Sequence, residues 1–339
     1  MNTLLLKEHA IKDISYSNIG LMEAAILESP GKFSIKNIPV PMPGPQEVVF
    51  EVEGCGVCAS SLPIFQGREC YNYPVTAGNP GHECWGRVVL TGSEVKTFKK
   101  GDRITALSYN GFAIYDKVDI RKAIRLPLEL KSLDFPGEPL GSAMNIFKRS
   151  DIKSGQTVAV IGVGFLGALI IQLAKSAGAK VIALSNRAYS LEIAKKCGAD
   201  EIIQLNDKQQ IIEKVKEITE GKFCDRVIEA SGKELTLNLS AELTKEKGKL
   251  VIAGFHEPGM RRVNVHLWNN KGIDIINAHE KDTHMHIKGM REAVDAVMAG
   301  KIITKDLYTH VFSLAEINKA FEMLINRPEG FMKALIKIN

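Results

Sequence analysis

The sequence predicts two domains, one mostly β and one α/β with a doubly wound parallel sheet. Residues 22–142 contain short alternating apolar runs cut by Pro and Gly, a pattern typical of strands joined by turns. After Gly155 the pattern changes to an apolar strand, an apolar-faced helix and a second strand. Such βαβ units form parallel sheets that helices cover on both faces.

The α/β part can be followed strand by strand. Its predicted strands are TVAVI, KVIALS, RVIEAS, GKLVIAGF and IDIINAH, with helical stretches between them. A helix is expected in MREAVDAVMAG, and the closing FMKALIKI reads as a strand that could return to the β-rich part. We therefore expect an appendage at 1–21, a β-rich domain built from 22–142 and 285–339, and an α/β domain at 143–284.

Composition limits the class of partner. The chain has 339 residues and a net charge of +5, but its 44 basic residues are scattered among 39 acidic ones, which argues against a nucleic-acid partner. No run of about 18 apolar residues and no signal-like start are present, so no membrane association is expected. Six irregularly spaced cysteines predict free thiols in a reducing compartment, the cytoplasm.

A glycine-rich turn, GVGFLG, follows the strand TVAVI and opens a helix. Gly162 can make the tight turn, Gly164 can let backbone N–H groups approach a pyrophosphate, and Gly167 can let helix and sheet pack closely. This context predicts a bound dinucleotide. The expected cofactor-binding residues are Gly162, Gly164, Phe165, Leu166, Gly167, Ser185, Asn186, Arg187, Ala230 and Gly254.

The end of the second strand of this unit bears on the choice of dinucleotide. A carboxylate there would accept hydrogen bonds from the adenosine ribose hydroxyls, but this strand ends in Ser185-Asn186-Arg187. Arg187 could pair with a 2′-phosphate, and the alternative is a solvated arginine on a loop. The sequence therefore favours NADP(H) over NAD(H).

The order CGVC, PGHE, EPLGSA and GVGFLG resembles that of the zinc-dependent medium-chain dehydrogenase/reductase family, the alcohol and polyol dehydrogenases. The resemblance covers nearly the whole chain from Met22 and includes Gly101-Asp102-Arg103 and GFAIYD at 111–116. It implies a GroES-like catalytic domain beside a Rossmann-type dinucleotide-binding domain. It also implies a homodimer or homotetramer that forms by edge-to-edge pairing of the cofactor domains.

The resemblance further implies one catalytic Zn²⁺ with three protein ligands, Cys58, His82 and Glu138, and one open position. Glu83 would tune or transiently join the metal, and Ser60 would be the first proton acceptor. The span from Arg87 to Lys117 contains no cysteine, so no structural zinc is expected. Cys55 is interpreted as a small packed residue rather than half of a redox pair.

Two departures from the family pattern affect the expected site. Pro63 stands where a histidine often ends the proton relay, and Ser61 replaces a carboxylate that supports the metal ligands in relatives. Residues 279–286 are dense in histidines and acids and could suggest another metal site, but a solvated linker is the better interpretation.

The resemblance implies an oxidoreductase that transfers hydride between a secondary alcohol or polyol, or the matching ketone, and NADP(H). Because Glu138-Pro139-Leu140 resembles the polyol branch, the expected substrate is a small polar alcohol or ketone. Two alternatives stay open. One is a zinc-free medium-chain reductase acting on quinones or enones, and the other is a non-catalytic NADPH-binding sensor, which the departures at Ser61 and Pro63 favour.

Overall fold

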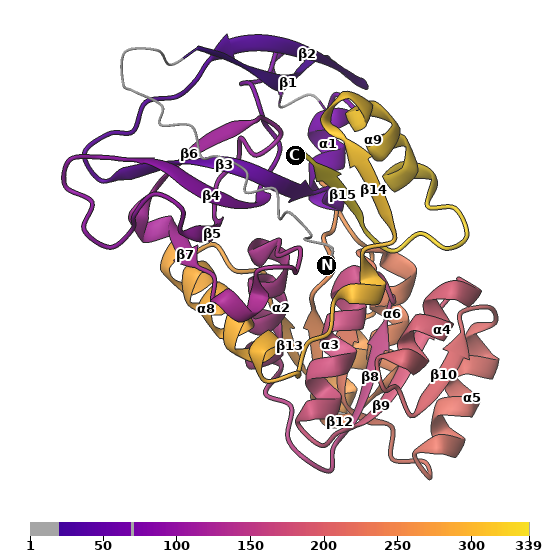
Figure 1. Cartoon of the computed structure of the whole chain (residues 1–339). Coiled ribbons are helices and arrows are strands. Elements are labelled where there is room, and N and C mark those ends of the chain that lie inside the picture. Colours follow the sequence, from indigo (N-terminus) through magenta and orange to yellow (C-terminus); the bar gives the residue numbers. More distant parts are fainter. Residues whose placement is uncertain (1–19, 69–70, 339) are drawn as a thin grey trace, which may run out of the picture.

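The computed structural model describes residues 20–68 and 71–338, and Figure 1 shows how its two parts are arranged. The chain begins in the β-rich part, continues into the α/β part and returns, so that the C-terminal elements lie beside α1 (Leu62–Phe65) (Figure 1). The expected appendage at 1–21 lies outside the described residues except for its last two positions.

The α/β part contains a six-stranded, all-parallel sheet in the order β10-β9-β8-β11-β12-β13. Counted from β8, this order is 3-2-1-4-5-6, that of a Rossmann-type fold, and it confirms the predicted fold class. Its strands are β8 (Thr157–Ile161), β9 (Lys180–Ser185), β10 (Glu201–Gln204), β11 (Cys224–Glu229), β12 (Thr244–Ile252) and β13 (Asp274–Asn277). The strand order reverses between β8 and β11, and ligands bind at such a point.

The alternation within the central strands explains why helices cover both faces of this sheet. In β8, Val158 and Val160 pack into one apolar cluster, whereas Ala159 and Ile161 pack into another. Successive side chains of a strand point to opposite faces, so a fully apolar strand needs cover on both sides. The surrounding helices are α3 (Phe165–Ser176), α4 (Ala188–Lys196), α5 (Lys208–Ile218), α6 (Glu234–Leu243) and α7 (Val265–Lys271).

The β-rich part contains a hairpin and a mixed sheet. The hairpin is β1 (Leu21–Ser29) with β2 (Lys32–Pro39), and the sheet runs β14-β15-β3-β4-β5-β7 with β6 paired to β3. These strands are β3 (Glu47–Gly56), β4 (Glu83–Thr91), β5 (Arg103–Ala106), β6 (Tyr115–Asp119), β7 (Ala123–Arg125), β14 (His310–Ser313) and β15 (Ala334–Lys337). Since β15 pairs with β3, the end of the chain completes a sheet begun near its start.

Two helices join the parts. The expected boundaries at 142 and 284 fall within α2 (Gly137–Ser150) and at the start of α8 (Thr283–Met298), which pack against each other (Figure 1). The domain division at these residues therefore stays a proposal. The linker interpretation of 279–286 was wrong for its second half, because the Asp282 carboxylate caps α8 by accepting hydrogen bonds from the backbone of His284 and Met285.

Arg103 anchors the approach to α2. Its side chain is 8% exposed, and its guanidinium donates to Glu53 and to the carbonyls of Leu130 and Leu133. Three hydrogen bonds satisfy most of the donors of a buried arginine. The segment that leads to Glu138 is therefore tied to the central sheet. Within the described residues, no helix is both long enough and apolar enough to cross a membrane.

Candidate metal and cofactor sites

Three side chains with metal-binding atoms gather where β3 ends and β4 begins. The ligand atoms of Cys58, His82 and Glu83 all lie within 4.8 Å of one another. Cys58 follows β3, while His82 directly precedes β4 and Glu83 is its first residue. The antiparallel register places Gly56 opposite Glu83, and a Cβ at Gly56 would lie 1.8 Å from the Glu83 carboxylate. The two strands thus bring the ligand segments together.

A backbone carbonyl sets the orientation of His82. Its Nδ1 lies 2.9 Å from the Pro80 carbonyl oxygen and donates to it, which directs Nε2 towards the cluster. The Ser61 hydroxyl donates to the same carbonyl at 3.5 Å. The Pro80 carbonyl thus accepts from both Ser61 and His82, and it fixes the orientation of the imidazole ring.

The negative charges around His82 favour the binding of a cation. Burial lowers the pKa of His82, but the hydrogen bond that the ring donates to Cys58 and the negative charges of Cys58, Glu138 and Glu83 outweigh it and raise this pKa to about 10. A thiolate, an imidazole and a carboxylate form a donor set that suits Zn²⁺. The residues present therefore fit a zinc ion.

Glu138, the predicted third ligand, lies near this cluster but outside the compact set. It is the second residue of α2, and its Oε1 accepts a hydrogen bond from the Ser142 hydroxyl at 3.0 Å. Its charge contributes to the raised pKa of His82, so its carboxylate lies within electrostatic reach of the imidazole. Its role as a ligand stays a prediction. Glu83 is the carboxylate that lies in the compact set with Cys58 and His82.

Sequence reasoning missed Lys333, which is bound to the cluster from the opposite end of the chain. Its Nζ lies 2.7 Å from Oε1 and 2.5 Å from Oε2 of Glu83, and the two side chains are 7% and 0% exposed. The same Nζ lies 5.2 Å from the centre of the Phe165 ring. The available signal was a lone lysine within the apolar run FMKALI, because a buried charge needs a partner.

Two further side chains lie beside the cluster. The Ser60 hydroxyl is 3.2 Å from Cys58 Sγ and 3.4 Å from His82 Nε2, so the predicted proton acceptor is next to both ligands. The Tyr109 ring centre is 6.3 Å from that of His82, and this side chain is 59% exposed. Tyr109, which sequence reasoning also missed, therefore offers an open aromatic face next to the cluster.

The glycine turn has the backbone shape that a pyrophosphate needs. Gly162 has φ +99°, and a Cβ there would lie 2.8 Å from the Ser231 nitrogen. A Cβ at Gly167 would lie 2.2 Å from the Gly162 carbonyl oxygen, whereas one at Gly164 would meet nothing within 4 Å. The turn is closed where it packs and open where a ligand would approach. Ala230 and Gly254 end neighbouring strands and border the same turn.

The first residues of α3 contribute differently. The Phe165 ring is 8% exposed and packs between Lys333 and Tyr308, whose ring centre lies 5.7 Å away. Its side chain is therefore part of the core, so a cofactor would meet its backbone N–H at the start of the helix. Leu166 is half-buried.

Arg187 is held by the segment that precedes β15. Its Nη2 donates to the carbonyls of Pro328 at 3.0 Å and Phe331 at 2.6 Å, and its backbone N–H donates to the Ser185 hydroxyl. The half-buried guanidinium is therefore bound by backbone carbonyls rather than by solvent alone, and its pairing with a 2′-phosphate stays a prediction. Asn186, beside it, is exposed.

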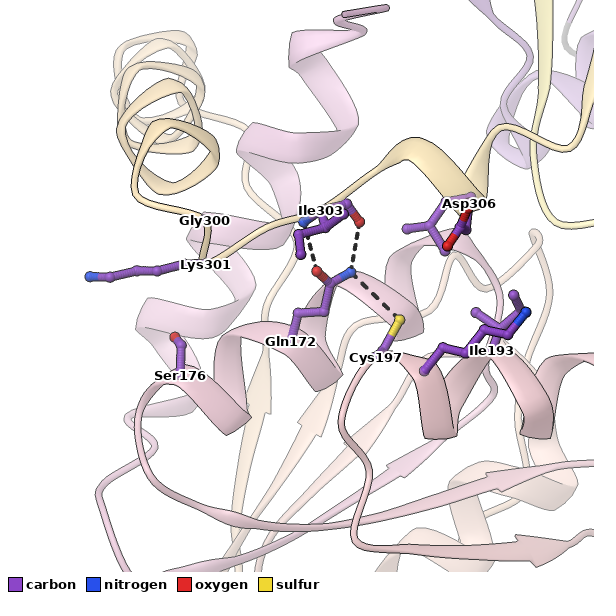
Figure 2. Close-up of a pocket in the computed structure, with 10 residues that line it drawn as sticks. Gln172, Ser176, Ile193, Cys197, Gly300, Lys301, Ile303 and Asp306 are labelled. Carbon is purple, nitrogen blue, oxygen red and sulfur yellow. Dashed lines mark hydrogen bonds between the residues drawn. The ribbon is translucent and has the colours of Figure 1, made fainter.

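A groove lies at the C-terminal end of α3, away from the glycine turn. Figure 2 shows it between α3, the end of α4 and the segment after α8. The Gln172 side chain exchanges hydrogen bonds with the backbone N–H and carbonyl of Ile303 (Figure 2). Because the glycine turn lies at the other end of α3, we interpret this groove as a joint that fixes the returning chain.

Comparison with known proteins decides the family. Residues 44–121 match the alcohol dehydrogenase GroES-like domain, and residues 166–298 match the zinc-binding dehydrogenase domain. The chain belongs to the zinc-binding alcohol dehydrogenase family. Membership makes it an oxidoreductase of the dehydrogenase class, with zinc and a nicotinamide cofactor as the reactive groups.

Full-length relatives agree with this family. The chain is 26% identical to sorbitol dehydrogenase of Bacillus subtilis (strain 168), over 94% of this chain and 98% of that protein. It is 28% identical to D-arabinitol dehydrogenase 1 of Uromyces fabae, over 90% and 95%. A Sinorhizobium meliloti 1021 structure bound to NADP, described as a zinc-binding dehydrogenase, is 28% identical with a TM-score of 0.80, over 94% of this chain and 99% of that one.

The buried Lys333 leads to a prediction about stability. Lys333→Met should lower the free energy of unfolding by about 3 kcal/mol, because it leaves the Glu83 carboxylate buried without its counter-charge. Lys333→Arg should cost less, since the cation is kept. Urea denaturation monitored by tryptophan fluorescence would measure both.

Lys337→Met provides the matched control for this prediction. Lys337 is the last residue of β15, four positions after Lys333, and pairs with Asp134, but the side chains of this pair are 35% and 28% exposed, so the loss should be below about 1 kcal/mol. Equal losses in Lys333→Met and Lys337→Met would contradict a special role for the buried pair.

Proposed function

We propose that this chain is a zinc-dependent dehydrogenase that transfers a hydride between a secondary alcohol or polyol, or the matching ketone, and NADP(H). One observation carries the proposal: Lys333 contacts both Glu83 of the metal cluster and Phe165 of the glycine turn. The two candidate sites therefore face each other across a distance that one side chain spans. Two relatives named for sorbitol and D-arabinitol support the polyol class.

The chain's own residues have distinct tasks in this proposal. Cys58, His82 and a carboxylate, Glu138 or Glu83, would hold the zinc. When bound, zinc would supply a Lewis acid that polarises a substrate oxygen. The Ser60 hydroxyl, beside both Cys58 and His82, would take the proton that leaves a substrate alcohol.

The proton must then leave Ser60 by a route other than a histidine at position 63. Pro63 is buried in α1 and has no proton to exchange. Water or a ribose hydroxyl of the cofactor would therefore serve as the next carrier. Tyr109 would form one wall for the substrate, since its exposed ring can stack on the carbon side of a polyol.

The assembly and location are also part of this proposal. β13 is an edge strand of its sheet, and Ile275 on it and Val265 on the adjoining α7 are exposed apolar side chains. An open edge with apolar neighbours suits pairing with a second copy, as a homodimer or within a homotetramer. Cys55, Cys58, Cys84, Cys197 and Cys224 are free thiols, which suits the cytoplasm.

The proposed activity predicts NADPH formation at 340 nm from small polyols such as sorbitol and arabinitol. Adding the zinc chelator 1,10-phenanthroline should abolish the rate, because the metal polarises the reacting oxygen. The non-chelating 1,7-phenanthroline is the control. Turnover of quinones or enones that survives chelation would instead show a zinc-free reductase, and binding without any turnover would show a sensor.

Metal content provides a second prediction. Protein purified without added metal should carry about one zinc per chain, the number expected for a single catalytic site, and Cys58→Ala and Glu138→Ala should lose it. Cys55→Ala is the matched control, because Cys55 is a fully buried thiol three residues away. Retention of zinc in Glu138→Ala together with loss in Glu83→Gln would move the third ligand to Glu83.

Arg187 carries the cofactor preference in this proposal. Arg187→Ala should weaken NADPH binding about tenfold or more, the loss expected when a charged hydrogen-bond partner is removed. The affinity for NADH, which lacks the 2′-phosphate, should stay almost unchanged. NADH is therefore the control for structural effects of losing the contacts to Pro328 and Phe331. Fluorescence titration with both nucleotides would measure this, and equal weakening of both would contradict the assignment.

A further inference from the structure

The segment 327–331 crosses from the catalytic domain to the adenosine end of the proposed cofactor site. It connects α9 (Ile317–Asn326) with β15, and its loop lies towards α4 (Figure 1). Two carbonyls of this segment accept from Arg187, and the carboxylate of Glu329 accepts from the backbone N–H of Tyr189 at 3.0 Å. Glu329 is therefore placed at the first turn of α4, just past the end of β9.

In dinucleotide-binding folds a carboxylate near this end of the second strand meets the ribose of adenosine. In such folds the acid follows the second strand in the sequence. Here β9 is followed by Asn186 and Arg187, neither of which is acidic. The nearby carboxylate belongs to Glu329, which lies 140 positions after its partner Tyr189 in the sequence. A sequence search near the strand cannot find it.

Arg187 and Glu329 have opposite effects on a 2′-phosphate. The guanidinium attracts the phosphate, whereas the carboxylate repels it and can accept a hydrogen bond from a free 2′-hydroxyl. Arg327, on the same segment, is a second positive group, and burial together with the charge of Arg187 lowers its pKa. The discrimination between the two cofactors therefore depends on a balance of nearby charges.

We propose that Glu329 is a specificity-determining residue that opposes Arg187 and limits the preference for a 2′-phosphorylated dinucleotide. The inference rests on the proposed function, since it assumes that a nicotinamide dinucleotide binds along the glycine turn. It adds a residue of the catalytic domain to the choice between NADPH and NADH.

The test compares dissociation constants of NADPH and NADH for the full chain and for Glu329→Gln, measured by nucleotide fluorescence. Glutamine keeps an oxygen that can accept from Tyr189, so the fold should be kept while the charge is lost. We expect NADPH to bind about tenfold more tightly and NADH about twofold more weakly, with a smaller difference at high salt. Glu322→Gln, on the exposed face of α9, makes the same charge change as a control.

The outcomes separate this inference from the proposed function. If Glu329→Gln changes both dissociation constants by the same factor, or resembles Glu322→Gln, the role of Glu329 is overturned while dinucleotide binding stands. If neither nucleotide binds the unaltered chain or any variant, the proposed function and the inference both fall. A shift of the NADPH to NADH ratio in Glu329→Gln alone supports both.

Discussion

The buried ion pair between Lys333 and Glu83 is the interaction on which the two candidate sites depend. It joins the first residue of β4 to the segment that enters β15, and both side chains are almost fully removed from water. Such a pair is stable only when both charges stay together, since either one alone would be buried without compensation. The C-terminal strand must therefore be in place before the metal cluster is complete. Because Lys333 also lies over Phe165, the same requirement extends to the start of α3.

Short sequence patterns predicted those parts of the fold that neighbouring residues determine by themselves. Continuous apolar runs predicted β8 and β9. The spacing of Gly162, Gly164 and Gly167 identified the turn, because the reason for a glycine at each of these positions lies in the turn itself. The strand β10 was missed because EIIQ is short, half-exposed and at the sheet edge. The start of α8 was misplaced because dense histidines and acids suggested a linker, whereas Asp282 uses its carboxylate as a helix cap.

The residues that sequence reasoning missed act through contacts between distant parts of the chain. Lys333 lies 250 positions from Glu83, and Glu329 lies 140 positions from Tyr189. The sequence prediction ranked Glu138 as the third ligand and Glu83 as its neighbour, but that order depends on where each carboxylate points. Gly56, opposite Glu83, leaves room for the carboxylate in the cluster, while Ser142 holds one oxygen of Glu138. Residue type predicted the chemistry of the site, but only the strand register shows which acid is already there.

The C-terminal segment therefore controls charge at both ends of the proposed cofactor site. Lys333 pairs with the carboxylate beside the predicted metal ligands, and Glu329, four residues earlier, accepts from the backbone of Tyr189, two residues after Arg187. At the first position a cation limits how freely Glu83 can turn to a metal, and at the second an anion limits how strongly Arg187 can hold a phosphate. The second effect requires the segment to rest against the α/β part, where the two carbonyls of Pro328 and Phe331 hold Arg187, whereas Lys333 and Glu83 both belong to the β-rich part. A movement that separates the two parts would thus break the contacts at Arg187 and the contact of Lys333 with Phe165, while the Lys333–Glu83 pair would stay intact within the β-rich part.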